Sequence, residues 1–259
     1  MMANKTLQNV MEAKVAQGEK AFVAYIMAGD GGLDALREQI LFLQEAGVTA
    51  IELGIPFTDP VADGPVIQEA GLRALATGAN LRAILKTISS FKEEIQIPLV
   101  VMTYLNPIIA FGIEDFVQAC EQSGISGLII PDLPLEEATL ISDELQGTDI
   151  ALVQLVSLTS PQQRIEKIAK AAEGFIYAVT VNGITGVRQG FTEQLEQHLS
   201  NLKKVSQIPV LAGFGISNAQ QVEEISAMVD GVIVGSAIVQ AFHEGHKEKI
   251  NELLNKQPV

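Results

Sequence analysis

The stretch Ala50-Ile-Glu-Leu-Gly-Ile-Pro-Phe-Thr-Asp-Pro-Val-Ala-Asp-Gly-Pro65 carries the pattern that decides the fold. Its apolar run, Ala50–Leu53, is short and rich in strand-forming residues, so it predicts a buried β-strand. A loop shaped by three prolines and two glycines follows, up to Pro65. A buried strand, a loop and then an amphipathic helix form the repeating unit of parallel α/β folds.

The same unit recurs on both sides of this stretch. Amphipathic segments lie between the apolar runs, for example Leu33–Ala46, Ile113–Ser123, Pro161–Ala172 and Asn218–Met228. Eight runs are strand candidates: Ala21–Met27, Ala50–Leu53, Pro98–Thr103, Gly127–Ile130, Ala151–Leu155, Phe175–Val179, Pro209–Ala212 and Gly231–Val234.

Eight such units in 259 residues favour a closed barrel over an open doubly wound sheet, which usually needs fewer strands. We therefore predict an α/β protein, a (β/α)8 TIM barrel that forms a single domain over residues 1–259. An extra helix, Thr6–Gln17, precedes the first strand, and we expect it to cover the N-terminal end of the barrel.

The composition limits the classes of partner. The chain is 47% hydrophobic and carries a formal net charge of −14, which disfavours binding to nucleic acid and to anionic membranes. Cys120 is the single cysteine, so no internal disulfide is possible, and we expect it to be buried on a helix. The N-terminus lacks the apolar core of a signal peptide, and no apolar run approaches the roughly 20 residues of a membrane span. These features predict a cytoplasmic protein.

Two connections are longer than the others, Gly54–Pro65 after the second strand and Thr180–Phe191 after the sixth. In a parallel barrel the loops that follow strands lie at the C-terminal face, where active sites are built. Chemically active side chains are therefore expected at the C-terminal ends of the strands.

Glu52 stands inside an apolar strand, where a charge is costly on either face. One interpretation is an ion pair with a neighbouring basic residue. Lys and Arg are absent from the C-terminal ends of the predicted strands, which favours the other interpretation, a carboxylate with a perturbed pKa poised for proton transfer.

Four aspartates lie near the same face. Asp59 and Asp63 are in the loop after Glu52, and Asp63 could either cap the helix that begins near Pro65 or pair with Glu52 as an acid/base couple. Asp30 and Asp132 follow other strands, and each could be catalytic or could hydrogen-bond to nearby loop backbone.

Other chemistries lack their residues. No lysine stands at a strand's C-terminal end, so Schiff-base catalysis has no nucleophile. The three histidines, His198, His243 and His246, fall in helical segments and are expected to be solvated. A Mg²⁺ site built from Asp30, Glu52 and Asp63 is conceivable, whereas no cluster suggests a transition metal, and our prediction is that the chain binds no metal.

Glycine-bearing turns follow the last three strands and predict a phosphate site. They are Gly183-Ile-Thr-Gly186, Gly213-Phe-Gly-Ile-Ser217 and Gly235-Ser236, the last of which opens the C-terminal helix. Glycine lets the backbone approach phosphate oxygens, and a helix N-terminus supplies N–H donors and a favourable dipole. The expected phosphate contacts are Gly186, Gly215, Gly235 and Ser236.

Taken together, these motifs resemble those of the tryptophan synthase α-subunit family. The run from Glu52 to Pro65 resembles the family signature, and the similarity extends over essentially the whole chain. It includes Ala28-Gly-Asp30, Met102-Thr-Tyr-Leu-Asn-Pro107, Pro131-Asp-Leu-Pro134, Gly183-Ile-Thr-Gly186, Gly213-Phe-Gly-Ile-Ser217 and Gly235-Ser-Ala-Ile-Val239.

The resemblance implies a retro-aldol cleavage of indole-3-glycerol phosphate to indole and glyceraldehyde 3-phosphate, without metal or organic cofactor. It implies that Glu52 is the acid/base at the glycerol hydroxyl and indole C3, and that Asp63 stabilises charge at the indole N–H. It further implies that Tyr177 lines the site and that Thr185 closes a mobile loop over Asp63. Tyr25 stands where the family often has a phenylalanine lining the indole pocket, and Ala24 and Val181 also depart from the common pattern.

The resemblance also implies a partner. This would be a pyridoxal-phosphate-bearing β subunit that receives indole in an α2β2 heterotetramer. We expect it to dock at the C-terminal face, on loops around Pro56, Asp59 and Asn106-Pro107. Alternatives are a stand-alone lyase that releases indole, another phosphosugar enzyme on the same barrel, or a catalytically weak subunit that mainly binds and regulates a partner.

Overall fold

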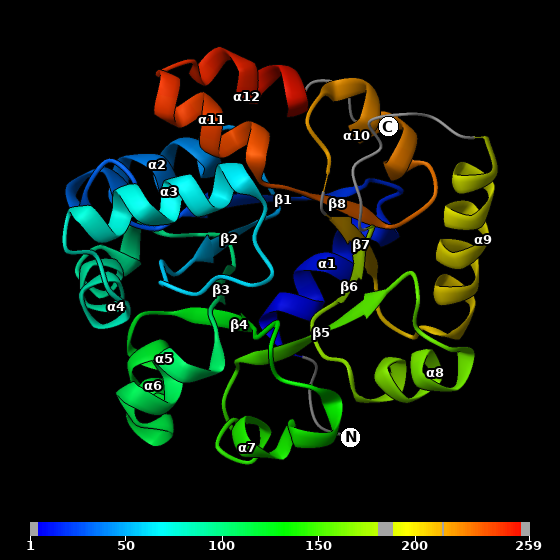
Figure 1. Ribbon diagram of the computed structural model, residues 1–259, viewed down its shortest axis with the longest axis horizontal. Helices are drawn as coiled ribbons and strands as arrows, with labels where there is room; N and C mark the ends of the chain where they lie inside the picture. The colour runs from blue at the N-terminus through cyan, green and yellow to red at the C-terminus, as the bar shows by residue number, and fades with distance from the viewer. Residues whose placement is uncertain (1–4, 181–188, 214, 255–259) are drawn as a thin grey trace.

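The computed structural model describes residues 5–180, 189–213 and 215–254, and its central element is a closed parallel barrel. Each strand pairs with the next along the chain, and the last pairs with the first (Figure 1). The strands are β1 (Ala21–Met27), β2 (Ala50–Gly54), β3 (Leu99–Met102), β4 (Ile125–Ile129), β5 (Ala151–Ser157), β6 (Ile176–Val179), β7 (Val210–Gly213) and β8 (Gly231–Val234). This confirms the predicted fold class, with strand ends shifted by no more than two residues.

Helices surround the barrel, as Figure 1 shows. Two short 3-10 segments, η1 (Lys92–Glu94) and η2 (Leu135–Glu137), complete the connections. The α-helices are α1 (Thr6–Ala16), α2 (Leu33–Glu45), α3 (Pro65–Ala76), α4 (Leu81–Ser89), α5 (Leu105–Phe111), α6 (Ile113–Gln122), α7 (Thr139–Ser142), α8 (Gln162–Ala171), α9 (Gln189–Val205), α10 (Ala219–Ser226), α11 (Ser236–Glu244) and α12 (Lys247–Leu254).

The strands are buried on both faces, which explains their continuous apolar sequences. All seven residues of β1 are buried, as are all five of β2. One face of each strand fills the barrel and the other packs against the helices, so nearly every strand position is buried, with partly exposed residues only at the C-terminal ends of β5 and β6. The charged Glu52 therefore stands out within β2.

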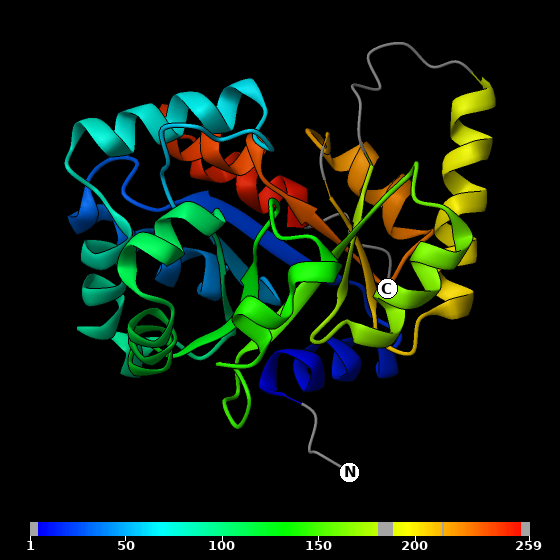
Figure 2. The ribbon, with the colours of Figure 1, turned by 60° about the horizontal axis from the view of Figure 1, so that its bottom comes forward.

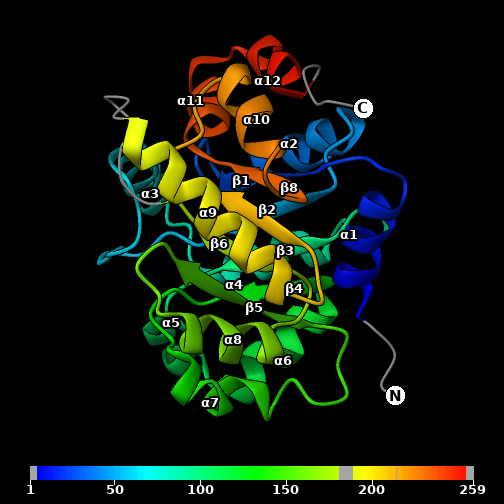
Figure 3. The ribbon, with the colours of Figure 1, turned by 90° about the vertical axis from the view of Figure 1, so that its right-hand side faces the viewer.

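Helix α1 closes the N-terminal end of the barrel, as the sequence predicted. Its Leu7 is fully buried against two glycines, because a Cβ added at Gly127 or at Gly174 would lie 2.7 Å or 2.8 Å from Leu7 Cδ2. Figures 2 and 3 show α1 at one end of the barrel, with α3 and the loop after β2 toward the other. This arrangement leaves the C-terminal end of the barrel for a site.

Cys120 is fully buried on α6, as expected. Among the residues that the structure describes, no helix is long and apolar enough to span a membrane.

Candidate active site

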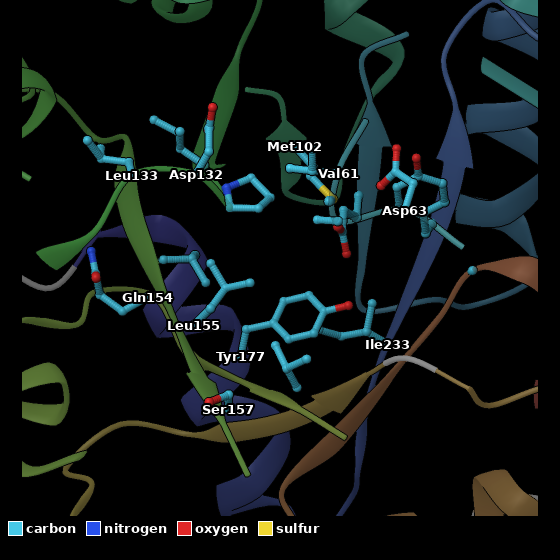
Figure 4. A pocket seen from close by; sticks show the side chains of 18 of the residues that line it. Val61, Asp63, Met102, Asp132, Leu133, Gln154, Leu155, Ser157, Tyr177 and Ile233 are labelled. Carbon is cyan, nitrogen blue, oxygen red and sulfur yellow. The ribbon is translucent and has the colours of Figure 1, made fainter. Parts of the chain in front are cut away.

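A cavity of about 960 Å³ opens at the C-terminal ends of the strands. It is lined by side chains from six of the strands and by the loop after β2, including Tyr25, Glu52, Asp63, Tyr177 and Ile233. In Figure 4 the Tyr177 ring lies between Leu155 and Ile233, with its hydroxyl on the side of Asp63. The long loop after β2 is thus part of the site, as its length predicted.

The Glu52 side chain points into this cavity and is only 1% exposed. Neither of its carboxylate oxygens has a hydrogen-bond partner within the described residues, so the ion-pair interpretation is wrong. Burial, with a smaller contribution from the negative charge of Asp63, raises the pKa of Glu52 to about 8. Glu52 therefore holds a proton at neutral pH and can donate it.

Asp63 lies in the loop after β2, close enough to Glu52 for the two charges to interact. Burial raises the pKa of Asp63 to about 6, and a hydrogen bond from Tyr104 opposes this rise. Gly64 is the N-cap residue of α3 and makes no side-chain cap, so the Asp63 carboxylate is free of the capping role that the sequence allowed. At neutral pH the pair thus holds one carboxylic acid and one carboxylate.

Tyr104 is a site residue that the sequence reasoning missed. Its hydroxyl donates to Asp63 and accepts a hydrogen bond from the Ala62 N–H at 3.0 Å. The centroid of its ring lies 5.3 Å from that of Phe57, which is in the loop after β2 together with Ala62 and Asp63. Tyr104 follows β3, the strand next to β2, so its place at a strand end was the available signal.

Tyr25 and Tyr177 lie over glycines of neighbouring strands. A Cβ added at Gly54 would be 1.9 Å from the Tyr25 hydroxyl oxygen, and one added at Gly213 would be 2.4 Å from that of Tyr177. Each ring therefore occupies space that a larger residue at the glycine would fill. Both tyrosines line the cavity with Glu52, and burial is the main cause that raises the pKa of each phenol. The charges of Asp63 and Glu52 add to this rise, with Asp63 the larger for Tyr25 and Glu52 the larger for Tyr177.

Two of the other strand-end aspartates have structural roles. Asp30 binds Arg73 through two hydrogen bonds, of 2.8 Å and 2.7 Å, which neither of its sequence interpretations anticipated. Asp132 accepts a hydrogen bond from the N–H of Leu105, the first residue of α5, at 2.9 Å, and it also lines the cavity. The described part of the chain contains no group of three His, Cys, Asp or Glu residues placed to hold a metal.

The histidines differ from one another. His243 and His246 are exposed, as expected. The expectation was wrong for His198 on α9, which is half-buried with its Nε2 lacking a hydrogen-bond partner within the described residues. Burial lowers the pKa of His198, and the residue does not line the cavity.

The glycine turns are only partly described. Gly215, Gly235 and Ser236 all line the cavity, and Gly235 precedes the first turn of α11. Gly215 has φ of +82°, and no atom lies within 4 Å of the place where its Cβ would be. These positions leave backbone accessible beside a helix N-terminus. Gly186, the fourth expected phosphate contact, and Thr185, which the resemblance assigns to a loop over Asp63, lie outside the described residues.

A closed parallel barrel whose mouth holds a buried acid beside a carboxylate defines a (β/α)8-barrel enzyme equipped for proton transfer. Residues 11–258 match the family model described as tryptophan synthase alpha chain. The chain belongs to this family, the carbon–carbon lyases of tryptophan biosynthesis that cleave indole-3-glycerol phosphate to indole and glyceraldehyde 3-phosphate.

Individual relatives agree over nearly the full length. The tryptophan synthase alpha chain of Listeria monocytogenes serotype 4a is 56% identical over 97% of this chain and 96% of its own. A solved structure of Mycobacterium tuberculosis tryptophan synthase is 31% identical with a TM-score of 0.90, covering 99% of this chain and 100% of that one. The structure of the alpha subunit from Legionella pneumophila is 31% identical with a TM-score of 0.85, covering 95% and 92%.

Proposed function

We propose that Glu52 and Asp63 carry out the cleavage of indole-3-glycerol phosphate in this chain. The observation that supports this most directly is the buried Glu52 carboxyl, which has no hydrogen-bond partner in the described residues and a pKa of about 8. A group with a pKa near the working pH can both donate and accept a proton within one cycle.

In the proposed cycle Glu52 first donates a proton and then regains one, so it ends the cycle protonated. Protonated Glu52 gives its proton to indole C3, and Asp63 stabilises the positive charge that develops on the ring by accepting a hydrogen bond from the indole N–H. The Glu52 carboxylate then takes the proton of the glycerol hydroxyl next to the ring. The carbon–carbon bond breaks, its electron pair restores the indole, and the hydroxyl-bearing carbon becomes the aldehyde of glyceraldehyde 3-phosphate.

The phosphate is proposed to bind at Gly215, Gly235 and Ser236, which follow β7 and β8, with Gly186 completing the site. The first N–H groups of α11 have no carbonyl partner within the helix, and they accept an anion favourably. Among the described residues that line the cavity, Arg164 is the one basic side chain, and it is paired with Glu136. Backbone N–H groups therefore supply the recognition in this proposal, and Tyr25 and Tyr177 contact the indole.

The decisive experiment on the carboxylate is Glu52→Gln, which keeps the shape and removes the proton transfer. We expect turnover to fall roughly 10²–10⁴-fold while substrate still binds. Indole release and binding of indole-3-glycerol phosphate would be measured for the wild type, Glu52→Gln and the control Glu137→Gln, an exposed carboxylate on η2. A loss of only about tenfold would instead favour a subunit whose main role is to bind a partner.

We further propose that the chain works in the cytoplasm, needs no cofactor of its own, and docks onto a pyridoxal-phosphate-bearing β subunit in an α2β2 assembly. Two exposed apolar side chains on connections that follow strands support a docking surface. Val61 in the loop after β2 is 84% exposed, and Ile109 on α5 is 55% exposed. Asn106 and Pro107 lie in the first turn of α5, so the expectation that they form a loop was wrong.

The docking proposal predicts that Val61→Ser weakens association with the β subunit roughly tenfold, because an apolar side chain of this size contributes about 1.5–3 kcal/mol when fully buried. Asp59→Ala tests the neighbouring loop contact. The control is Leu72→Ser on α3, which removes another exposed apolar side chain. Calorimetric titration gives the affinity, light scattering gives the stoichiometry, and indole formation gives the activation. A β subunit that neither binds the wild type nor changes its rate would make this chain a stand-alone lyase.

A further inference from the structure

The position of the Tyr25 hydroxyl follows from the strand register. Tyr25 on β1 is the register partner of Glu52 on β2. Gly54 lies two residues after Glu52, and residues two apart on a strand share a face. Because the Tyr25 hydroxyl occupies the space that a Cβ at Gly54 would fill, it lies beside the Glu52 side chain on the same face of β2.

Both side chains are buried, and Glu52 is not satisfied by the protein. The two Glu52 oxygens have no hydrogen-bond partner within the described residues, and the pKa of Tyr25 is raised by burial and by nearby charges, with no hydrogen bond among the causes. Tyr25 is 6% exposed and lines the cavity. A phenol and a carboxyl that share a buried space form a natural donor and acceptor pair once the carboxyl is ionised.

The proposed reaction creates that ionised state. Between the two proton transfers Glu52 is a carboxylate at a buried position, and a buried carboxylate without a donor is strongly disfavoured. The other titratable groups that face Tyr25 are Asp63, Tyr104 and Tyr177. Tyr104 already donates to Asp63, and the Tyr177 hydroxyl lies against Gly213 of β7, which β8 and β1 separate from β2.

We propose that Tyr25 is a positioning residue whose hydroxyl donates a hydrogen bond to the Glu52 carboxylate after Glu52 has protonated the substrate. This inference rests on the proposed acid/base role of Glu52. It gives a function to a position where the chain departs from the family pattern. The ring stays packed over Gly54, so the hydroxyl is held beside Glu52 without rearrangement of the strands.

The test is Tyr25→Phe, which keeps the ring and removes the hydroxyl. With ¹³C-labelled glutamate, the Glu52 carboxyl signal is assigned by its loss in Glu52→Gln and is titrated without substrate. We expect the pKa of Glu52 in Tyr25→Phe to rise by about one unit above its wild-type value. We also expect kcat to fall about 10- to 100-fold, the range for a hydrogen bond to a charged group, with KM changed no more than about twofold.

Tyr104→Phe is the matched control, because it removes a hydroxyl of the same cavity that serves Asp63. It should leave the pKa of Glu52 unchanged or lower it, since a more readily protonated Asp63 repels the Glu52 charge less. A Glu52 pKa that is the same in Tyr25→Phe and the wild type would overturn the proposal, whatever happens to kcat. If Glu52→Gln proved active, the acid/base role would fail, whereas the titration would still report whether the hydroxyl reaches Glu52.

Discussion

At the scale of single residues, two carboxylates of similar intrinsic acidity are given different roles by their surroundings. Glu52 is fully enclosed and has no donor within the described residues, so burial and the nearby charge of Asp63 both favour its protonated form. Asp63 receives the Tyr104 hydroxyl, which favours its ionised form. The environments thus separate an acid from a carboxylate, as an acid/base couple requires.

This separation predicts a bell-shaped pH profile for kcat/KM. The rate should rise as Asp63 ionises, near pH 6, and fall as Glu52 loses its proton, near pH 8. In Tyr104→Phe the lower limb should move to higher pH, because the lost hydrogen bond had held the pKa of Asp63 down. Steady-state rates from pH 5 to pH 9 check this, and an unmoved lower limb would show that it does not report Asp63.

At the scale of elements, the barrel is closed at one end and open at the other. Helix α1 closes the N-terminal end through Leu7, which fits over glycines where the barrel wall has no side chain. At the other end, Gly54 and Gly213 leave room for tyrosine rings that shape the cavity. Small residues at defined strand positions therefore decide where larger ones from neighbouring elements can pack.

Leu7→Ala should destabilise the protein by about 2–5 kcal/mol, because it removes a fully buried side chain that rigid strands cannot replace. Val15→Ala, on an exposed part of the same helix, is the control and should change stability little. Urea unfolding of the three proteins gives the comparison. Equal stability of Leu7→Ala and the wild type would mean that α1 packs only loosely against the barrel.

At the scale of the whole molecule, the chain is strongly acidic and yet its substrate is a phosphate ester. A formal net charge of −14 repels anions at a distance. The proposed phosphate site therefore depends on short-range donors at Gly215 and at the start of α11. The acidic pair lines the same cavity from β2 and the loop that follows it, so in this proposal the carboxyl groups face the indole and glycerol parts of the substrate.

Inorganic phosphate should consequently raise the melting temperature at constant ionic strength, because it binds the native state alone. Ser236→Asp should abolish this rise by placing a negative charge at the helix N-terminus. The control is Ser160→Asp, which adds the same charge at another part of the cavity lining. Thermal scans across phosphate concentrations decide the matter, and a rise that persists in Ser236→Asp would place the anion elsewhere.

The sequence by itself determined the barrel and the place of its site. Eight short apolar runs alternating with amphipathic segments leave few architectures open, and Glu52 inside such a run marked a perturbed carboxyl. The sequence did not locate every helix start within the connections. We predicted a loop at Asn106-Pro107, but proline is tolerated in the first turn of a helix, and α5 begins one residue before Asn106.

Only the tertiary structure decided which of the candidate carboxylates work together. Asp30 and Asp63 both follow strands, yet Arg73 engages the first and Tyr104 the second. The contact of Tyr25 with Gly54 depends on the register between β1 and β2. These partners lie far apart in the chain, and a shift of one residue in register would turn each side chain to the other face of its strand. The local sequence sets the chemical type of each residue and the element in which it lies. The packing of strands that are far apart in the chain determines which other residues it contacts.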